Sequence, residues 1–146
     1  MYESVEAWCL VASLCAYMLI QPNMELAPDI HGEHESDLET NLAWGKRLLA
    51  ETIEVRKDCN YVEFPTLNSV TISFFFFGSN FCLEKHNLAW FHLREATTLA
   101  LFLGMHQEDT YLQLDVVEAK LSRRLFWVLF VTERLFTVPA YSHDHR

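Results

Sequence analysis

The spacing of apolar and polar residues along the chain predicts helices joined by short loops. Residues 5–20 are apolar almost without interruption, and residues 36–57 place apolar side chains at helical intervals. Further apolar segments follow at 67–83, at 88–103, and from 115 to the helix-stopping Val138-Pro139 step. The pattern predicts an all-α protein, a multi-helix array of about five helices.

The first two segments differ in the surfaces they offer. Residues 5–20 are apolar nearly all round, so we expect other helices to cover both faces. The apolar run is shorter than the about 20 residues of a membrane span, so we interpret it as a buried helix rather than a membrane helix. Residues 36–57 are amphipathic, and Ser36 with Glu39 has the spacing of a capping box that opens a helix.

The segment 67–83 contains four consecutive phenylalanines, Phe74 to Phe77. Propensity alone predicts a strand over 70–77, because β-branched and aromatic residues dominate there. No other segment offers a partner strand, and an unpaired strand is not stable alone. Thr66 is a plausible N-cap for a helix instead. Four adjacent rings point in all directions from a helix, so such a helix would be central.

Residues 88–103 end at Gly104, which suits a left-handed C-terminal position, with Met105 packing back on the last turn. A stripe of small residues allows another helix to approach closely; it contains Ala89, Ala96 and Ala100, beside His92 and Leu103. We interpret His92 as a core histidine bonded to backbone rather than as a ligand. Asp115 and Glu118 then repeat the capping-box spacing and open the last helix.

The last helix carries two different stripes. The apolar stripe is Leu121, Leu125, Val128, Leu129, Thr132, Leu135 and Phe136. The opposite stripe is cationic and aromatic: Lys120, Arg123, Trp127, Phe130 and Arg134. Either this is a buried helix whose charged ends reach water, or it contacts partners on both sides.

Three motifs occur in a fixed order near this helix. They are Arg94-Glu95-Ala96, Leu103-Gly104-Met105-His106, and Arg123-Arg124-Leu125-Phe126-Trp127, which Glu133-Arg134 soon follows. The ordered set resembles the fungal-specific transcription factor domain, the middle homology region of zinc-cluster transcription factors. The resemblance covers residues 65–139 well and 36–57 more loosely.

The resemblance implies a helix at 67–83 and a regulatory region of a nuclear transcription factor. It implies control of metabolic genes, and the run LFWVLFVTER is similar to regulators of sugar utilisation. Its implied partners are a second copy, other transcription proteins or an unknown small-molecule effector. The family's six-cysteine zinc cluster is not in this sequence, so no zinc-binding or DNA-binding residue can be carried over, and no cofactor is expected. We expect residues 1–146 to be a single partial regulatory domain, a fragment of a larger helical domain.

Composition narrows the function further. The net charge of −9 and the pI near 5.1 disfavour direct binding to phosphate backbones. Cys9, Cys15, Cys59 and Cys82 lack the spacing of a structural zinc site. The His and acidic residues at 31–35 and 143–145 are interpreted as solvated rather than metal-binding. No phosphate loop, nucleophile elbow or zinc-protease motif is present, so we expect no enzyme.

The residues expected to matter are charged and aromatic groups on the last two long helices: Arg94, Glu95, Arg123, Arg124, Trp127, Glu133 and Arg134. A charge within an apolar helix needs a partner, so we predict that Glu95 pairs with Arg123 or Arg124 across two antiparallel helices. The alternative function is a helical interaction or dimerisation module without a ligand, since Trp and Arg are common interface anchors.

Overall fold

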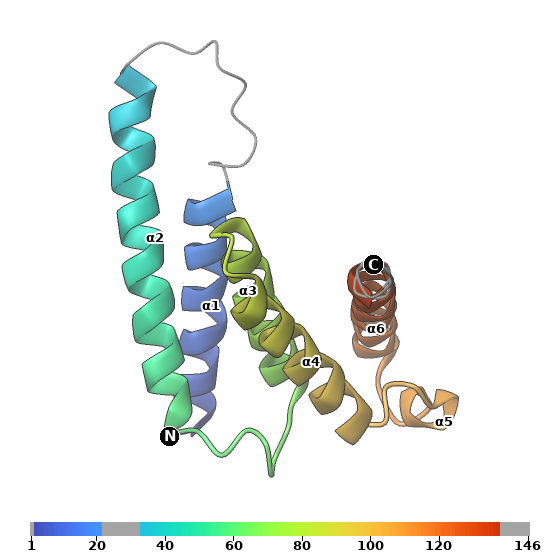
Figure 1. Ribbon diagram of the computed structural model, residues 1–146. Helices are drawn as coiled ribbons and strands as arrows, with labels where there is room; N and C mark the ends of the chain where they lie inside the picture. The colour runs from blue at the N-terminus through green and yellow to red at the C-terminus, as the bar shows by residue number, and fades with distance from the viewer. Residues whose placement is uncertain (1, 22–32, 138–146) are drawn as a thin grey trace, which may run out of the picture.

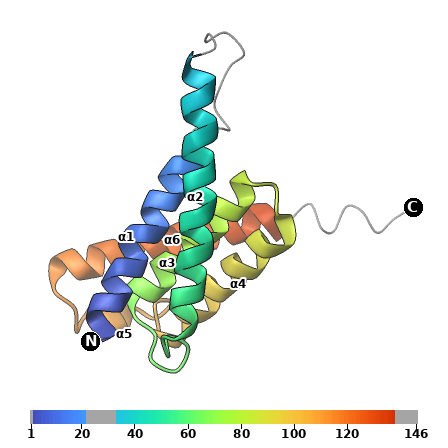
Figure 2. The same ribbon diagram turned by 90° about the vertical axis from the view of Figure 1, so that its left-hand side faces the viewer.

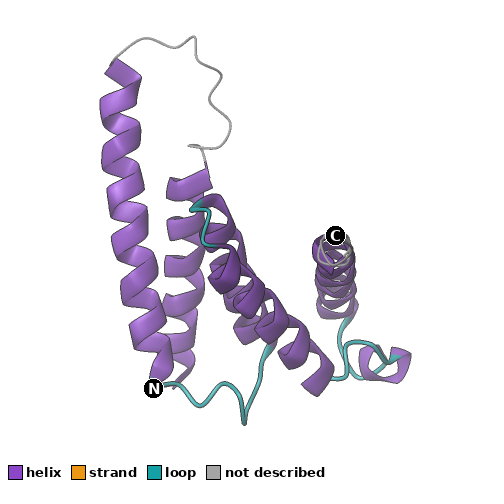
Figure 3. Cartoon of the chain, viewed as in Figure 1, coloured by secondary structure: helices purple, strands orange, loops and turns teal. Residues whose placement is uncertain are grey.

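The computed structural model describes residues 2–21 and 33–137, and within these residues it is all helix and turn (Figures 1 and 3). The helices are α1 (Tyr2–Ile20), α2 (Glu33–Lys57), α3 (Leu67–Cys82), α4 (His86–Phe102), α5 (Glu108–Tyr111) and α6 (Val116–Thr137). The predicted all-α class is confirmed. The short helix α5 lies in the segment expected to connect the last two long helices.

Helices α1 and α2 form a long antiparallel pair (Figures 1 and 2). They approach closely at Gly45, where an added Cβ would lie 2.8 Å from Ile20 Cγ1. One face of α1 is buried through small residues such as Ala12, Ser13 and Ala16. The expectation that both faces are covered is wrong within the described chain, because Trp8, Val11, Leu14 and Met18 on the other face stay exposed.

Helix α1 is also the one described helix long and apolar enough to cross a membrane, over Glu3–Ile20. Length and composition alone meet that test, and the core helix of a soluble protein meets it too. Here one face of α1 packs against α2 and α3, but only 28% of the Glu3–Ile20 segment is buried, so the prediction of a buried helix holds for one face only.

Helix α3 lies at the centre, as its four phenylalanines predicted, and it contacts α1, α4 and α6. Thr66 caps it, since its hydroxyl accepts from the Ser69 amide at 3.1 Å. The rings point outward in different directions: Phe75 stacks on Tyr17 of α1, and Phe77 meets Phe136 of α6 edge-on. The helical interpretation of this segment is therefore confirmed.

Helix α4 returns along α3, and Ala89, Ala96 and Ala100 are buried at this packing. It ends as predicted. Gly104 has φ +71°, and the Met105 amide donates back to the Ala100 carbonyl at 3.1 Å. Met105 is buried.

The two predicted capping boxes have different outcomes. The Asp115 carboxylate accepts from the amides of Val117 and Glu118, both at 2.8 Å, so it caps α6 as expected. The prediction at Ser36 is wrong, because α2 already begins at Glu33 and the Ser36 carbonyl accepts from Thr40 within the helix. Acidic residues suit a first helical turn, which favours the earlier start.

Helix α6 packs on α4 and α3 with a face rotated from the predicted one. Its buried residues are Ala119, Ser122 and Leu129, and Phe126 and Phe136 are half-buried. Leu121, Val128 and Leu135 were assigned to the packed stripe, but they are exposed.

Candidate functional site

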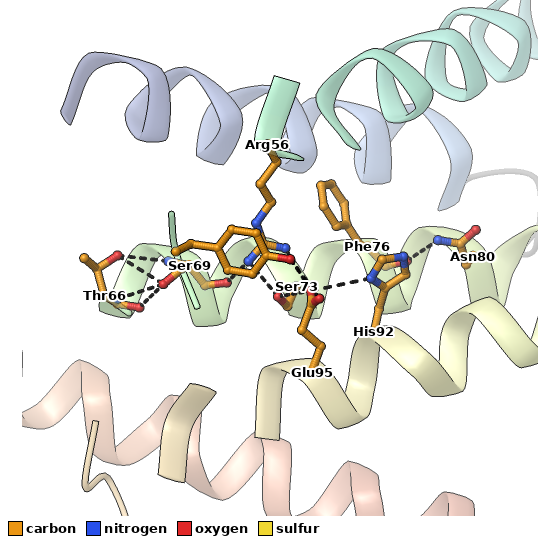
Figure 4. A network of polar contacts seen from close by, with 9 residues as sticks. Arg56, Thr66, Ser69, Ser73, Phe76, Asn80, His92 and Glu95 are labelled. Carbon is orange, nitrogen blue, oxygen red and sulfur yellow. Dashed lines mark hydrogen bonds and ion pairs between the residues drawn. The ribbon is translucent and has the colours of Figure 1, made fainter. Parts of the chain in front are cut away.

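A buried polar network links α2, α3 and α4 around Arg56 (Figure 4). Arg56 is the second-last residue of α2, and only 4% of it is exposed. Its Nη1 donates to Glu95 Oε1 at 3.0 Å. Its Nη2 donates to the Ser69 carbonyl and to the Ser73 hydroxyl, both at 2.8 Å. One guanidinium therefore joins three helices.

Aromatic rings enclose the same guanidinium. Its carbon lies 3.8 Å from the ring centre of Tyr61 and 5.3 Å from that of Phe76. Ring faces attract cations, so this enclosure offsets part of the cost of burying the charge. Burial lowers the pKa of Arg56 and the nearby Glu95 carboxylate raises it, but an arginine has so high an ordinary pKa that it stays charged at neutral pH.

Glu95 of α4 is the anionic partner in this network. Besides Arg56, it accepts from the Ser73 hydroxyl at 2.7 Å and from the Tyr61 hydroxyl at 3.0 Å. The His92 Nδ1 lies 3.7 Å from Glu95 Oε1, beyond hydrogen-bond length. Burial raises the pKa of Glu95, but its contacts with His92, Ser73, Arg56 and Tyr61 outweigh that effect and lower it to about 2. Glu95 is therefore ionised throughout the physiological range.

His92 is buried, as expected of a core histidine. Its ring meets Phe76 edge-on at 5.3 Å. The expected backbone hydrogen bond is not what holds it: the Nδ1 has no hydrogen-bond partner among the described residues, and its nearest anionic group is Glu95. Ring packing therefore positions this histidine.

A cleft of about 450 Å³ opens beside the network, between the start of α1 and the loop that precedes α3. Its lining combines carboxylates, small polar groups and aromatic rings: Glu3, Glu6, Cys59, Asn60, Tyr61, Phe64 and Thr66. The Thr66 hydroxyl donates to Glu6, which ties the two sides together. Tyr61 belongs to both features, because its ring lines the cleft and its hydroxyl reaches Glu95.

The predicted pairing of Glu95 with Arg123 or Arg124 is wrong. Glu95 lies on the face of α4 turned toward α3 and α2, whereas α6 meets the neighbouring face that carries Arg94. Arg123 instead pairs with Glu108 of α5 at 2.7 Å, and Arg124 is exposed.

The other predicted residues lie on α4 and α6, and one pair of them joins the two helices. Arg94 of α4 forms an ion pair with Glu133 of α6 and also lies over the Trp90 ring, 5.3 Å from its centre. Trp127 contacts Phe130 edge-on at 5.8 Å, and Arg134 lies 5.0 Å from the centre of the Phe130 ring. Trp127 and Arg134 are exposed on α6, and within the described chain none of these side chains pairs with Glu95.

Comparison with known proteins assigns the family. Residues 16–138 match the family described as "Fungal specific transcription factor domain". The chain belongs to this family. The match includes the whole Arg56–Glu95 network and the α4–α6 junction, but it leaves out Glu3 and Glu6 of the cleft.

A curated relative is similar to part of this chain. The "Probable sucrose utilization protein SUC1" of Candida albicans is 36% identical over 90 residues, which cover 62% of this chain and 18% of the relative. The chain thus matches less than a fifth of the relative's length. No solved structure matches the domain.

Sequence reasoning missed Arg56, which the domain uses at the centre of its polar network. A signal was present, because Leu49, Thr52 and Arg56 follow one another at helical spacing on the buried face of α2. An arginine in line with core residues needs a carboxylate nearby. Among the described residues, no group of three or more His, Cys, Asp or Glu lies close enough to hold a metal ion. The acidic and histidine residues at 31, 34 and 143–145 have side chains outside the described residues.

Proposed function

We propose that this chain is a regulatory region of a fungal transcription regulator, and that it does not itself bind DNA. The family match over residues 16–138 carries the proposal. The relative is named a probable sucrose utilization protein, and this supports a role of the chain in controlling genes of sugar use. Under this proposal the chain acts in the nucleus, as part of or beside a protein that holds the DNA-binding module.

The net charge of the chain supports the proposal that a separate module binds the DNA. A net charge of −9 repels phosphate backbones, so a separate cationic module has to hold the DNA. A gel-shift experiment tests this with the purified chain and duplex DNA at moderate salt. We expect no sequence-dependent retardation, and sequence-dependent retardation would contradict the proposal.

A reporter experiment tests the regulatory role. The chain is fused to an unrelated DNA-binding domain, and reporter output is compared during growth on glucose and on sucrose. We expect the fusion to change output with the sugar, relative to the DNA-binding domain alone. Lys46→Glu, at an exposed position of α2, is expected to leave the response intact, whereas Leu129→Asp in the core is expected to abolish it. Identical output from all fusions would contradict the role.

A second function, an interaction module without a ligand, is favoured by the exposed outer surface of α6. The two functions differ in their response to sugars. A sensor is stabilised by a ligand that binds only its folded state, so its melting temperature rises with ligand concentration. A sugar that raises the melting temperature of the wild type but not of Asn60→Ala, in the lining of the cleft, favours the sensor. Concentration-dependent mass without any sugar response favours the interaction module.

A further inference from the structure

The outer side of α6 carries an apolar seam, interrupted by Arg124, that no described helix covers. The seam residues recur alternately every four and every three positions: Val117, Leu121, Arg124, Val128, Val131 and Leu135. The five apolar members are between 45% and 68% exposed. This alternation is the spacing by which one helix packs lengthwise against another. The seam therefore has the geometry of a helix-binding surface about 30 Å long.

Aromatic and cationic side chains flank this outer seam. Trp127 is 61% exposed and is supported by its edge contact with Phe130. Trp and Arg are the residue types that most often dominate binding energy at interfaces. An exposed tryptophan held by a neighbouring ring loses little freedom when a partner covers it.

The charge of α6 is opposite to that of the whole chain. α6 contains four cations, Lys120, Arg123, Arg124 and Arg134, against two carboxylates. One of these carboxylates, Glu133, is already paired with Arg94. Lys120 and Arg124 form no ion pair with any described residue. A surface with uncommitted cations beside an apolar seam attracts a partner that supplies carboxylates.

A second copy bound through the same seam does not meet this requirement. In a two-fold symmetric contact the same patch lies on both sides. Such a contact brings together two α6 helices that each carry more cations than carboxylates, and like charges across an interface are unfavourable.

We propose that the outer seam of α6 binds an acidic amphipathic helix from another protein segment. The apolar face of that helix covers Leu121, Trp127 and Val128, and its flanking carboxylates meet Lys120 and Arg124. This interaction goes beyond the regulatory role proposed above, because it names the surface and the chemistry of its partner.

Fluorescence anisotropy with labelled peptides tests the proposal on the full chain. The probe is a peptide of about 20 residues with leucines at helical spacing and glutamates elsewhere. One control has the same composition in scrambled order, and another keeps the leucines but replaces glutamate with lysine. We expect the ordered acidic peptide to bind at least about tenfold more tightly than either control, with affinity falling as salt rises.

Variants at exposed positions locate the binding surface. Arg124→Glu and Val128→Ser are each expected to weaken binding about tenfold while leaving the helical circular dichroism unchanged. The matched controls are Lys46→Glu on α2, which also reverses a positive charge, and Val11→Ser on α1, which makes the same apolar-to-polar change; both positions are exposed. These controls are expected to bind like the wild type.

Three results would overturn the proposal. Equal affinity for the ordered and scrambled peptides would show that charge alone is recognised. Displacement of the peptide by duplex DNA at equal concentration would show a general polyanion surface. A doubling of mass that Val128→Ser abolishes, with no peptide binding, would assign the seam to a second copy of the chain.

Discussion

Arg56 holds a full positive charge where almost no water reaches it. Its two Nη atoms donate to one carboxylate, one hydroxyl and one carbonyl, and a ring lies against its face, whereas its Nε has no hydrogen-bond partner among the described residues. Desolvating two charges costs more than a simple contact returns unless such extra bonds are made. The pair with Glu95 is therefore sensitive to the loss of either partner.

Removing one partner of this pair is expected to destabilise the fold strongly. Arg56→Ala or Glu95→Ala leaves a buried charge without a partner, which costs roughly 3–5 kcal/mol. Denaturant unfolding of both single variants and the double variant measures the coupling between them. We expect the double variant to lose clearly less than the sum of the two single losses.

The exposed pair of Glu54 and Lys57 is the control for this cycle. Its members are solvated, so its coupling should stay within about 0–1 kcal/mol. Strictly additive losses at Arg56 and Glu95 would contradict their pairing.

The same carboxylate makes stability depend on pH in the acid range. The pKa of Glu95 is lowered from 4.5 to about 2 in the folded chain. Its contribution is therefore fully present above pH 4.5 and is lost as the pH falls through about 2. The difference corresponds to roughly 3 kcal/mol at neutral pH.

Urea unfolding of the wild type and of Glu95→Gln, between pH 7 and pH 2.5, measures the contribution of Glu95 to the free energy of unfolding. We expect the wild type to be more stable at pH 7 and the difference to shrink as the pH falls below 4.5. Glu54→Gln changes an exposed carboxylate of the same kind and should track the wild type. A difference that is constant across this range would show that Glu95 does not titrate as described.

At the scale of helices, local sequence signals predicted three helix ends correctly and missed the start of α2, which lies at Glu33 rather than at Ser36. Thr66, Gly104 and Asp115 each act as predicted, because caps depend on neighbouring residues only. The face of α6 was predicted only in part: Leu125, Leu129 and Phe136 pack as predicted, whereas Leu121, Val128 and Leu135 are exposed. Both sides of α6 are rich in apolar residues, and only the packing against α3 and α4 selects one. Periodicity identifies an apolar stripe but not its neighbour.

The close contact between α1 and α2 depends on Gly45, which has no side chain. An alanine at position 45 would place its Cβ 2.8 Å from Ile20 Cγ1 and 3.1 Å from Leu19 Cβ. Gly→Ala inside a helix normally stabilises by up to about 1 kcal/mol. Here we expect Gly45→Ala to destabilise, because overpacking costs about 1–3 kcal/mol.

Thermal unfolding of Gly45→Ala and of Ala43→Gly tests this contact. Ala43 is exposed on the same helix, so its replacement should lose only the helix propensity of about 1 kcal/mol. If Gly45→Ala raises the melting temperature, the helices are not as close as described.

For the whole molecule, the site was harder to predict than the fold. The Arg56–Glu95 pair joins residues 39 positions apart, so no local pattern relates them. Arg94 and Glu95 are adjacent, yet one meets α6 and the other meets α2 and α3. Which charge turns inward depends on where three helices lie relative to α4, and that is a property of the assembled chain.

The described chain also leaves apolar surface uncovered at places the sequence did not indicate. In α3, Phe76 and Phe77 are buried and Phe74 and Phe75 are half-buried. The exposed apolar stripe of α1 instead contains Trp8, Val11, Leu14 and Met18. We expect the chain to bind a dye specific for apolar surface and to associate at high concentration.

Polar substitution on α1 tests this expectation. Val11→Ser combined with Met18→Ser should lower both dye binding and association while keeping the helical content. Ala50→Ser, at an exposed position of α2, removes no large apolar group and should change neither. A monodisperse wild type that binds no dye would contradict the expectation.

The central helix has a consequence for the chain before it folds. Residues 70–77 combine β-branched and aromatic side chains with no charge and no proline, which is the composition of segments that form intermolecular β-sheets. In the native protein Phe75, Phe76 and Phe77 pack against rings of α1, α4 and α6, respectively. A nascent or refolding chain presents the same segment to its neighbours until α3 is enclosed. The yield of folded protein is therefore set by competition between helix packing and aggregation, and it should fall as the protein concentration during refolding rises.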